Sequence, residues 1–476
     1  MRNRRLALVG AIAALAPFAA SAHAAKSGHT PTFRQYESPV GAKGQVGLPS
    51  TGLPHTGNFS QSGIGDHCGE PTLGVDRKTG AVLFQCGLQT LRVTGFDKSG
   101  RGSSTWTDVT GLLEGYQTSD PILYTDPTTN RTYVNQLELQ GCSLQAFTDD
   151  DGASWKPSAT GCGPGIAFDH QTVGSGKPAK GSTLAPVGYP NLLYYCTNDI
   201  EFTDCAVSVD GGESFLPATP VDTDARCQTI TGHVKSAPDG TVYLMPSGCG
   251  HGQGVYVSGD NTLSWTLREI PGATQGNAGD GSIAVGKDGT LYAAYGSNDA
   301  GPASQGGGRV HVVVSRNKGA KWGRDVALGK DVGVVQTRFP VAVAGDGDRA
   351  AIAYLGTKTR GNSNNPKFRG VWRLYLSYTF DRGAHWTTYD ATPGSPVQVG
   401  EICTLGTVGC LDADTQTSPD RNLLDFIDMV VDPRGYPAVA IADGCLKSTT
   451  CSVKDRLEKG AIIRQVGGRS LFHRFD

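Results

Sequence analysis

The sequence has little of what helical proteins are built from. Charged residues make up 18 % of the 476 residues, and methionine occurs three times. Runs rich in Ala, Leu, Glu, Lys and Arg, which favour long helices, are missing after the first 25 residues. These absences exclude coiled coils and helical bundles. A hydrophobic content of 38 % excludes wholesale disorder as well.

Three further absences limit the partners that we expect. After the N-terminal segment no apolar run is long enough to cross a bilayer, so we expect no membrane span. The formal net charge is −2 and basic residues do not cluster, so we expect no nucleic-acid partner. There is no Cys-x-x-Cys pair and the histidines are scattered, which argues against zinc. We predict no cofactor and no metal centre.

The first residues indicate export. Arg2, Arg4 and Arg5 precede an apolar run over residues 6–20, and Ala22-His23-Ala24 has the small-x-small pattern of a cleavage site. We therefore predict a signal peptide over residues 1–24 and a secreted protein. The twelve cysteines fall into short-range couples, which in an exported protein predicts a disulfide framework. Connectivity cannot be deduced from sequence, so pairing of neighbours is a hypothesis; the couples are 68 and 86, 142 and 162, 196 and 205, 227 and 249, 403 and 410, and 445 and 451.

Glycine and proline are abundant, at 66 and 26 residues, and they accompany a repeat. Its form is Ser/Thr-x-Asp-x-Gly-x-x-aromatic, and the aromatic residues are 50 to 64 positions apart. The copies, some of them imperfect, span Thr148–Trp155, Ser208–Phe215, Ser258–Trp265, Ser315–Trp322 and Thr379–Trp386. Each copy predicts a hairpin turn, in which the Asp side chain accepts backbone amide hydrogens and the aromatic ring packs beneath.

A second hairpin signal lies upstream of each copy, such as Asp239-Gly240 or Asp288-Gly289 between alternating strands. Seven such signals can be counted. A four-stranded unit repeated at this spacing is typical of a propeller blade. We predict an all-β fold with a single β-propeller over residues 66–476; seven blades are favoured and six remain open. Residues 25–65 are expected to form an extended arm, which could lend a closing strand around residues 36–40.

The repeat resembles the Asp-box, or bacterial neuraminidase repeat, of the sialidase superfamily. The resemblance implies a propeller in which Asp150, Asp210, Asp260 and Asp381 are structural. It also implies a machinery of three arginines that clamp the substrate carboxylate, a tyrosine nucleophile activated by a glutamate, and an aspartic acid as proton donor. The nearest match to the family's first arginine motif is Thr337–Pro340, between the fourth and fifth copies. Tyr375 and Tyr116 are the candidate nucleophiles.

Candidate site residues follow from blade geometry, because the first strand of each blade lines the central channel. Ionisable residues stand where these strands begin, and groups that converge at a channel mouth can shift each other's pKa. The predicted catalytic residues are Glu70, Asp120, Asp280, Asp169 and His170, and the predicted substrate-binding residues are Arg338, His233, Arg421 and Asp425. In the Asp169-His170 pair the carboxylate could orient the imidazole, although neighbouring strand residues point to opposite faces. The alternative is that these residues cap strand ends.

Two functions remain open from the sequence. The first is a secreted sialidase-like glycoside hydrolase that releases a terminal sugar. The second is a non-catalytic propeller that binds a glycan, a cell-wall polymer or a protein at its channel mouth. In either case we expect a monomer whose partner is a glycan or glycoconjugate. Calcium binding by Asp149–Asp151 or by residues 412–420 is a further hypothesis, with a solvated turn as its alternative.

Overall fold

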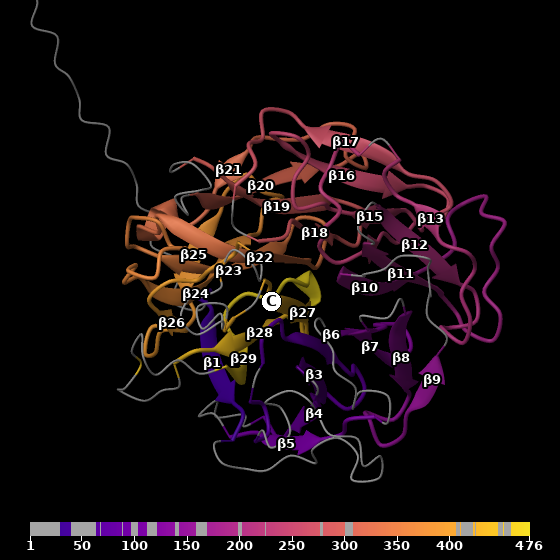
Figure 1. Cartoon of the computed structure of the whole chain (residues 1–476), viewed down its shortest axis with the longest axis horizontal. Coiled ribbons are helices and arrows are strands. Elements are labelled where there is room, and N and C mark those ends of the chain that lie inside the picture. The colour runs from indigo at the N-terminus through magenta and orange to yellow at the C-terminus, as the bar shows by residue number, and fades with distance from the viewer. Residues whose placement is uncertain are drawn as a thin grey trace, which may run out of the picture.

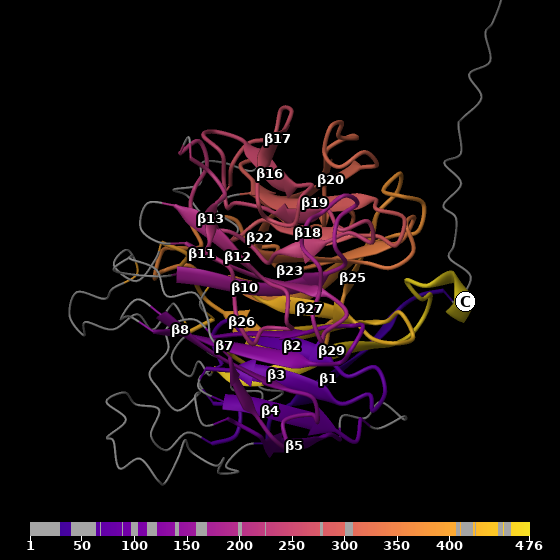
Figure 2. The same ribbon diagram turned by 90° about the vertical axis from the view of Figure 1, so that its right-hand side faces the viewer.

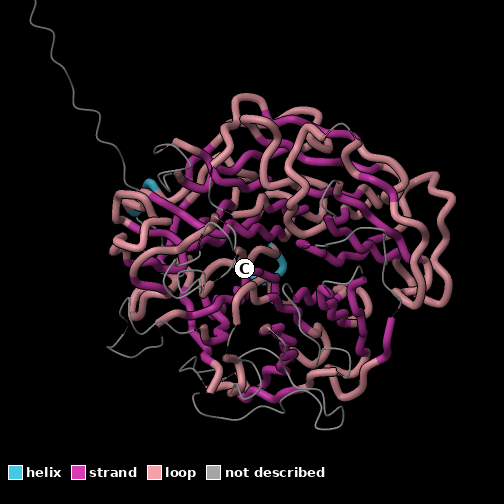
Figure 3. The backbone as a smooth tube through the Cα atoms, viewed as in Figure 1, coloured by secondary structure: helices cyan, strands magenta, loops and turns pink. Residues whose placement is uncertain are grey.

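Seven antiparallel sheets surround a central channel, as the computed structural model shows (Figure 1). The structure describes residues 29–39, 63–66, 68–87, 89–96, 103–111, 121–138, 142–158, 169–198, 202–223, 225–276, 279–299, 308–405, 410, 422–423, 425–445, 451 and 458–476. Within these residues the helices are two one-turn 3-10 segments, η2 (Lys330–Val332) and η4 (His473–Phe475). Strands make up nearly all of the regular structure in Figure 3. The predicted all-β fold with seven blades is confirmed.

The strands of each blade follow one another from the channel outward. Blades 1 and 2 contain β2 (Thr72–Val75), β3 (Val82–Cys86), β4 (Gln89–Thr94) and β5 (Thr105–Asp108), then β6 (Pro121–Thr125), β7 (Thr132–Glu138), β8 (Cys142–Thr148) and β9 (Lys156–Ser158). Blades 3 and 4 contain β10 (Asp169–Gly176), β11 (Leu192–Asn198), β12 (Thr203–Ser208) and β13 (Thr219–Pro220), then β14 (Lys235–Ser236), β15 (Val242–Leu244), β16 (Gln253–Ser258) and β17 (Thr266–Ile270).

The remaining three blades complete the ring. Blade 5 contains β18 (Ser282–Val285), β19 (Leu291–Ser297), β20 (Arg309–Ser315) and β21 (Val326–Ala327). Blade 6 contains β22 (Gln336–Ala344), β23 (Ala350–Thr357), β24 (Val371–Thr379) and β25 (Thr387–Asp390), with β26 (Gln398–Val399) also paired to β24. Blade 7 contains β27 (Asp428–Val431), β28 (Pro437–Asp443), β29 (Lys459–Gly467) and, as its outermost strand, β1 (Thr32–Glu37).

The pairing of β1 with β29 joins the two ends of the chain. The strands are antiparallel, and Tyr36 lies opposite Ile462. Without β1, the outer edge of β29 would be unpaired. The pairing of β1 with β29 covers this edge and closes the ring. The arm therefore supplies a closing strand, a few residues earlier than the position considered from the sequence.

The repeat turns have the hydrogen bonds that their sequence predicts. Asp150 Oδ1 accepts the Thr148 hydroxyl at 2.7 Å and the Ser154 backbone N–H at 2.8 Å. Gly152 has a φ of 83°, which a residue with a Cβ adopts only with strain. The Trp155 ring nitrogen donates to the Val109 carbonyl of the preceding blade at 2.6 Å. These hydrogen bonds lower the pKa of Asp150, although burial by itself raises it.

Buried tyrosines on the second strands connect neighbouring blades. Tyr133 donates its hydroxyl to the Gly211 carbonyl at 2.8 Å, and Tyr292 donates to the Gly347 carbonyl at the same distance. Both rings are completely buried in the apolar layers between blades. Each contact satisfies a turn carbonyl of the next blade, so the turns and the inter-blade core stabilise one another.

Five of the six predicted cysteine pairs are confirmed. They are Cys68–Cys86, Cys196–Cys205, Cys227–Cys249, Cys403–Cys410 and Cys445–Cys451. Cys162, of the sixth predicted pair, lies outside the described residues, as do residues 1–28 with the predicted signal peptide. In the described part of the chain, no helix is long and apolar enough to cross a membrane. The C-terminal segment lies at one face of the ring (Figure 2).

Candidate active site

The first strands of the blades begin at the same mouth of the channel, and three of these starts have a left-handed backbone. Glu70, His170 and Phe339 have φ values of 52°, 49° and 58°. Such a conformation costs roughly 1–2 kcal/mol for a residue with a side chain. In β10 and β22 the pairing with the next strand shifts register at this point. These irregularities turn side chains away from simple alternation, and similar ones cluster at functional sites.

Side chains of three blades converge at this mouth. Glu70, His170 and Asp425 each place a carboxylate oxygen or ring nitrogen within 4.8 Å of the others. Glu70 is 1 % exposed, and its Oε1 accepts the Asp425 backbone N–H at 3.2 Å. Two oxygen donors and one imidazole nitrogen form a set that a divalent cation can bind. The hydrogen bond from the Asp425 backbone to the buried Glu70 carboxylate fixes the position of Asp425.

His170 is held by a carboxylate from another blade. Its Nδ1 lies 2.9 Å from Asp280 Oδ2, and the other oxygen of Asp280 accepts the Ser247 hydroxyl at 2.7 Å. The Phe426 ring packs edge-on against His170 with 6.4 Å between ring centroids. Since Asp280 engages Nδ1, proton transfer at this imidazole would use Nε2.

A second charged layer lies further along the channel. His233 Nδ1 is 3.5 Å from Asp428 Oδ1, and Asp428 Oδ2 accepts the Leu73 backbone N–H at 3.2 Å. Burial alone raises the pKa of Asp428, but the hydrogen bond and charge of His233 and the charge of Lys235 lower it below its ordinary value. Burial lowers the pKa of Lys235, and Asp428 opposes that shift. A fixed carboxylate therefore stands beneath the mouth.

A cavity of about 670 Å³ opens over the first layer. Its walls come from blades 3, 4 and 5, from the segment that follows β26 and from the segment that precedes β27. Most lining residues carry polar side chains, with amides and hydroxyls between the ionisable groups, while carbon atoms supply the larger part of the exposed wall. The lining residues are His170, Gln228, Ile230, Ser247, His251, Thr274, Gln275, Gly276, Gly279, Asp280, Asn298, Thr404, Leu405 and Asp425. None of these lining residues is a lysine or an arginine. This volume is in the usual range of small-ligand sites.

Two disulfides bracket parts of the cavity wall. Cys227–Cys249 closes the segment that carries Gln228, Ile230 and Ser247, and Cys403 bonds to Cys410 beside Thr404 and Leu405. A covalent bond restricts the conformations open to such loops. The cavity wall is therefore fixed by the same bonds that the cysteine spacing predicted.

Four of the predicted residues lie together at this mouth: Glu70, His170, Asp280 and Asp425. His233 lies in the second layer, beside Asp428. Asp120 and Arg421 lie outside the described residues, and of Asp169 the structure describes the backbone position in β10.

The structure gives His170 a carboxylate partner from another blade. The sequence suggested that the adjacent carboxylate, Asp169, orients the imidazole, with strand alternation as the objection. The register shift between Asp169 and Thr172 and the positive φ of His170 remove that alternation. The carboxylate bonded to His170 Nδ1 is Asp280, two blades away.

The sialidase machinery is not assembled among the described residues. Arg338 has no exposed surface; its guanidinium donates to the Thr337 carbonyl at 2.8 Å and to the Ser363 hydroxyl. Burial lowers the pKa of Arg338 to about 10. Its predicted contact with substrate is therefore incompatible with this structure, because the packing of blade 6 encloses it. Tyr375 is 2 % exposed and stacks on Tyr354 inside the same blade. Tyr116 lies outside the described residues.

The sequence interpretation missed Asp428, Lys235 and Phe426. A signal for Lys235 was present, because residues two apart on a strand share a face and Lys235 follows His233 by that spacing. Asp428 is three positions after Asp425, so alternation gives it no such signal. Their pairing across the channel has no local signature.

The carboxylates of the first repeat turn are engaged by protein groups. Arg131 donates to both oxygens of Asp149, at 2.8 and 2.9 Å, and Thr79 donates its hydroxyl to Asp151 at 3.0 Å. The structure thus favours the alternative of a solvated structural turn over calcium binding there. Residues 412–420 lie outside the described residues.

No family profile matches the chain, and no curated protein sequence is similar to it. Solved structures of similar shape include the NanB sialidase of Streptococcus pneumoniae, 10 % identical over 83 % of this chain and 83 % of that one, with a TM-score of 0.41. An alpha-L-arabinanase of Penicillium chrysogenum is 12 % identical over 73 % of this chain and 92 % of that one, with a TM-score of 0.41. An ancestral GH74 enzyme is 15 % identical over 83 % and 46 %, with a TM-score of 0.47.

Proposed function

We propose that the protein is an exported glycoside hydrolase that releases a terminal, uncharged sugar at the channel mouth. The observation that carries the proposal is the convergence of Asp280, Asp425 and Glu70 on His170 beside the cavity. Glycosidases ordinarily need two carboxyl groups, one to protonate the leaving oxygen and one to act on the sugar or on a water molecule. Disulfides on the cavity wall are compatible with an oxidising, extracellular setting.

The roles follow from position. Asp425 lines the cavity, and its backbone N–H donates to the carboxylate of Glu70, which fixes its position; Asp425 is assigned the proton donor. Asp280 also lines the cavity, contacts His170 Nδ1 at 2.9 Å and accepts the Ser247 hydroxyl, so its carboxylate has a fixed orientation. Asp280 is assigned the nucleophile or base. Glu70 and His170 act through these two as positioning residues.

The choice of an uncharged sugar rests on the cavity wall. A sialic acid carboxylate would call for a guanidinium partner, whereas the wall offers amides and hydroxyls such as Gln228, Gln275 and Asn298. These groups match sugar hydroxyls. Sialoside hydrolysis would depend on Arg421 or on other groups outside the described residues.

The test compares wild type with Asp280→Asn and Asp425→Asn on fluorogenic glycosides. The panel holds uncharged terminal sugars and a sialoside, and Asp239→Asn, an exposed carboxylate of blade 4, is the matched control. We expect turnover of an uncharged glycoside to fall by about 10²–10⁴-fold in either site variant and to stay unchanged in the control.

Three results would contradict the proposal in different ways. Turnover of the sialoside alone would replace the substrate class. Full turnover in both Asn variants would move the reaction away from this mouth. Saturable glycan binding by wild type without turnover would establish the non-catalytic propeller, because the amides and hydroxyls of the cavity wall can bind a glycan without any reaction.

A further inference from the structure

A second cavity lies at the seam where the ring closes, between blade 7 and blade 1. Its volume is about 820 Å³. Residues of β1, β29, β4 and the turns after β2, β8 and β27 line it: Tyr36, Thr79, Gly80, Ala81, Arg92, Thr94, Gly95, Phe96, Asp151, Arg434, Arg464, Gln465 and Val466. We call it the seam groove. It shares no lining residue with the cavity of the candidate active site.

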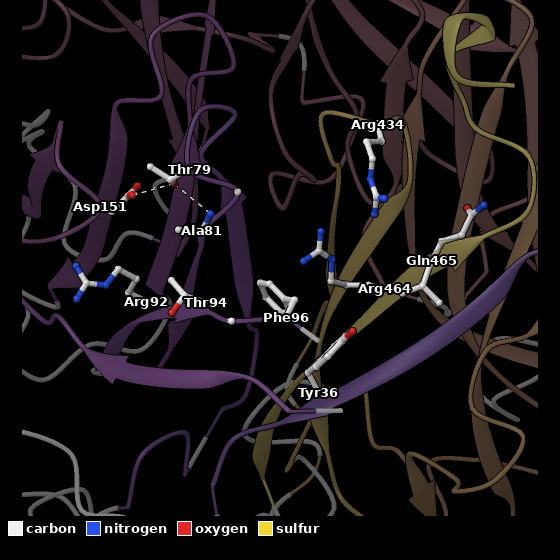
Figure 4. Close-up of a pocket in the computed structure, with 13 residues that line it drawn as sticks. Tyr36, Thr79, Ala81, Arg92, Thr94, Phe96, Asp151, Arg434, Arg464 and Gln465 are labelled. Carbon is white, nitrogen blue, oxygen red and sulfur yellow. Dashed lines mark hydrogen bonds between the residues drawn. The ribbon is translucent and has the colours of Figure 1, made fainter. Parts of the chain in front are cut away.

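Three arginines from three separate elements line this groove; in Figure 4 Arg434 and Arg464 point toward one another, whereas the Arg92 side chain points away from them, to the side of Asp151. The groove lining holds one carboxylate, that of Asp151, which accepts the Thr79 hydroxyl at 3.0 Å. The chain as a whole has a net charge of −2, so this excess of positive charge is local. Local positive potential in a concave site attracts anions.

The two arginines of blade 7 share a single carboxylate oxygen. Asp432 Oδ2 lies 3.4 Å from Arg464 and 3.9 Å from Arg434, which are long contacts for ion pairs. The other oxygen of Asp432 accepts the backbone N–H groups of Arg434 and Tyr436 at 2.8 and 2.9 Å. One carboxylate, partly occupied by its own turn, therefore balances two guanidinium groups.

Aromatic rings hold these guanidiniums in place. Arg464 lies over the Phe96 ring at 4.2 Å, and Phe96 meets Tyr36 edge-on at 5.0 Å. Arg434 lies over the Tyr436 ring at 5.2 Å. Arg464 has a side-chain exposure of 12 %, and burial lowers its pKa, which Asp432 opposes. A guanidinium that is fixed and desolvated, as that of Arg464 is, loses little entropy when it pairs with an anion, whereas Arg434 is exposed and open to a ligand from solvent.

We propose that the seam groove binds an acidic glycan, with a sulfate or carboxylate group of the glycan held between Arg434 and Arg464. Hydroxyl and amide groups of Thr79, Thr94 and Gln465 line the same groove and provide partners for sugar hydroxyls. The groove would hold the protein on an acidic polymer while the channel mouth hydrolyses a glycosidic bond at another place. It does not depend on the reaction at the mouth, because the two cavities have separate walls.

The test measures binding of wild type to dextran sulfate and to polygalacturonate, with neutral dextran and sodium sulfate as reference ligands. The variants are Arg434→Gln and the double variant Arg92→Gln/Arg434→Gln; Arg464 is left intact because it is buried. Arg324→Gln, an exposed arginine of blade 5, is the matched control. We expect the Kd for at least one acidic polymer to rise about tenfold in Arg434→Gln and further in the double variant, with no change in Arg324→Gln.

Each other outcome overturns a part of the proposal. An unchanged Kd in the double variant, or an equal loss in Arg324→Gln, would remove the groove as the site. Equal affinity for neutral dextran would remove the anionic group as the recognised feature. If sodium sulfate binds as tightly as the polymers, the groove is a site for small anions and does not recognise a glycan. Turnover at the mouth, measured on a small fluorogenic substrate, is expected to be unchanged in both groove variants.

Discussion

Asp428→Asn is expected to destabilise the whole ring by removing the charge that balances Lys235. Asp428 is 4 % exposed, and its charge opposes the lowering of the pKa of the half-buried Lys235 by desolvation, so loss of the carboxylate leaves that ammonium group without its counter-charge. Asp428 also lies 3.5 Å from His233, and removal of one partner from a buried pair of this kind costs about 3–5 kcal/mol. The Asn side chain keeps an oxygen that can accept the Leu73 N–H, so the loss reports the charge and not that hydrogen bond.

The propeller contains its own control for this substitution. Thr72 Oγ1 accepts the Leu123 N–H at 2.8 Å, and Thr172 Oγ1 accepts the Val234 N–H at 3.0 Å, as Asp428 does for Leu73. Thr72→Val removes such an inter-blade hydrogen bond without removing a charge. Its expected cost is about 1–3 kcal/mol, the penalty for one unsatisfied buried N–H.

The assay is urea unfolding of wild type, Asp428→Asn, Lys235→Met, the double variant and Thr72→Val at pH 7. The double variant should be more stable than the sum of the single losses predicts, by about 1–3 kcal/mol. Because the folded pKa of Asp428 is lowered, its contribution is present above its unfolded pKa of about 3.9 and is lost as the pH falls through the folded value. The reasoning is refuted if Asp428→Asn costs no more than Thr72→Val, or if Lys235→Met adds its full cost.

Two further predictions concern pH and disulfides. Burial alone lowers the pKa of His311, but Asp299 and Asp325 raise it overall. The contribution of the charged imidazole to the free energy of unfolding should therefore be complete below the unfolded pKa of about 6.5. It should fade as the pH rises through the pKa of His311 in the folded protein. His311→Gln should therefore lower the free energy of unfolding more at pH 5.5 than at pH 8.5, and an equal loss at both would contradict the assignment. Replacement of Cys227 and Cys249 by Ser should cost about 3 kcal/mol, since the bond spans 22 residues, and should also weaken substrate binding at the mouth. The same change at Cys196 and Cys205 should lower stability without weakening substrate binding, because this bond spans nine residues and neither cysteine lines the cavity. Equal effects of the two replacements on binding would show that the cavity wall does not depend on its disulfide.

The blades could be predicted because their signals are local. Asp150 and Ser154 are four residues apart, and the turn that they form needs no other part of the chain. The same holds for the strand alternation around each turn and for neighbouring cysteines such as Cys196 and Cys205, which lie directly opposite on paired strands. Counting these units was enough to favour seven blades.

The mouth could be predicted only in part. Glu70, His170, Asp280 and Asp425, chosen for their position at the start of a first strand, lie near one another in the structure. The same rule failed for Arg338, because Ser363 and the Trp372 ring enclose its side chain within blade 6. Whether a residue at a strand start faces the channel depends on side-chain burial, and burial depends on the packing of the whole blade.

The sequence by itself determined the repeating unit, its turns, its disulfide couples and the set of ionisable residues that could reach the channel. The tertiary structure decided which of them meet. His170 contacts Asp280, which is 110 positions away in the sequence, since closure of the seven blades brings distant strand starts to one point. The seam groove exists for the same reason, because Arg92 and Arg464 become neighbours only when β1 joins β29 and closes the ring.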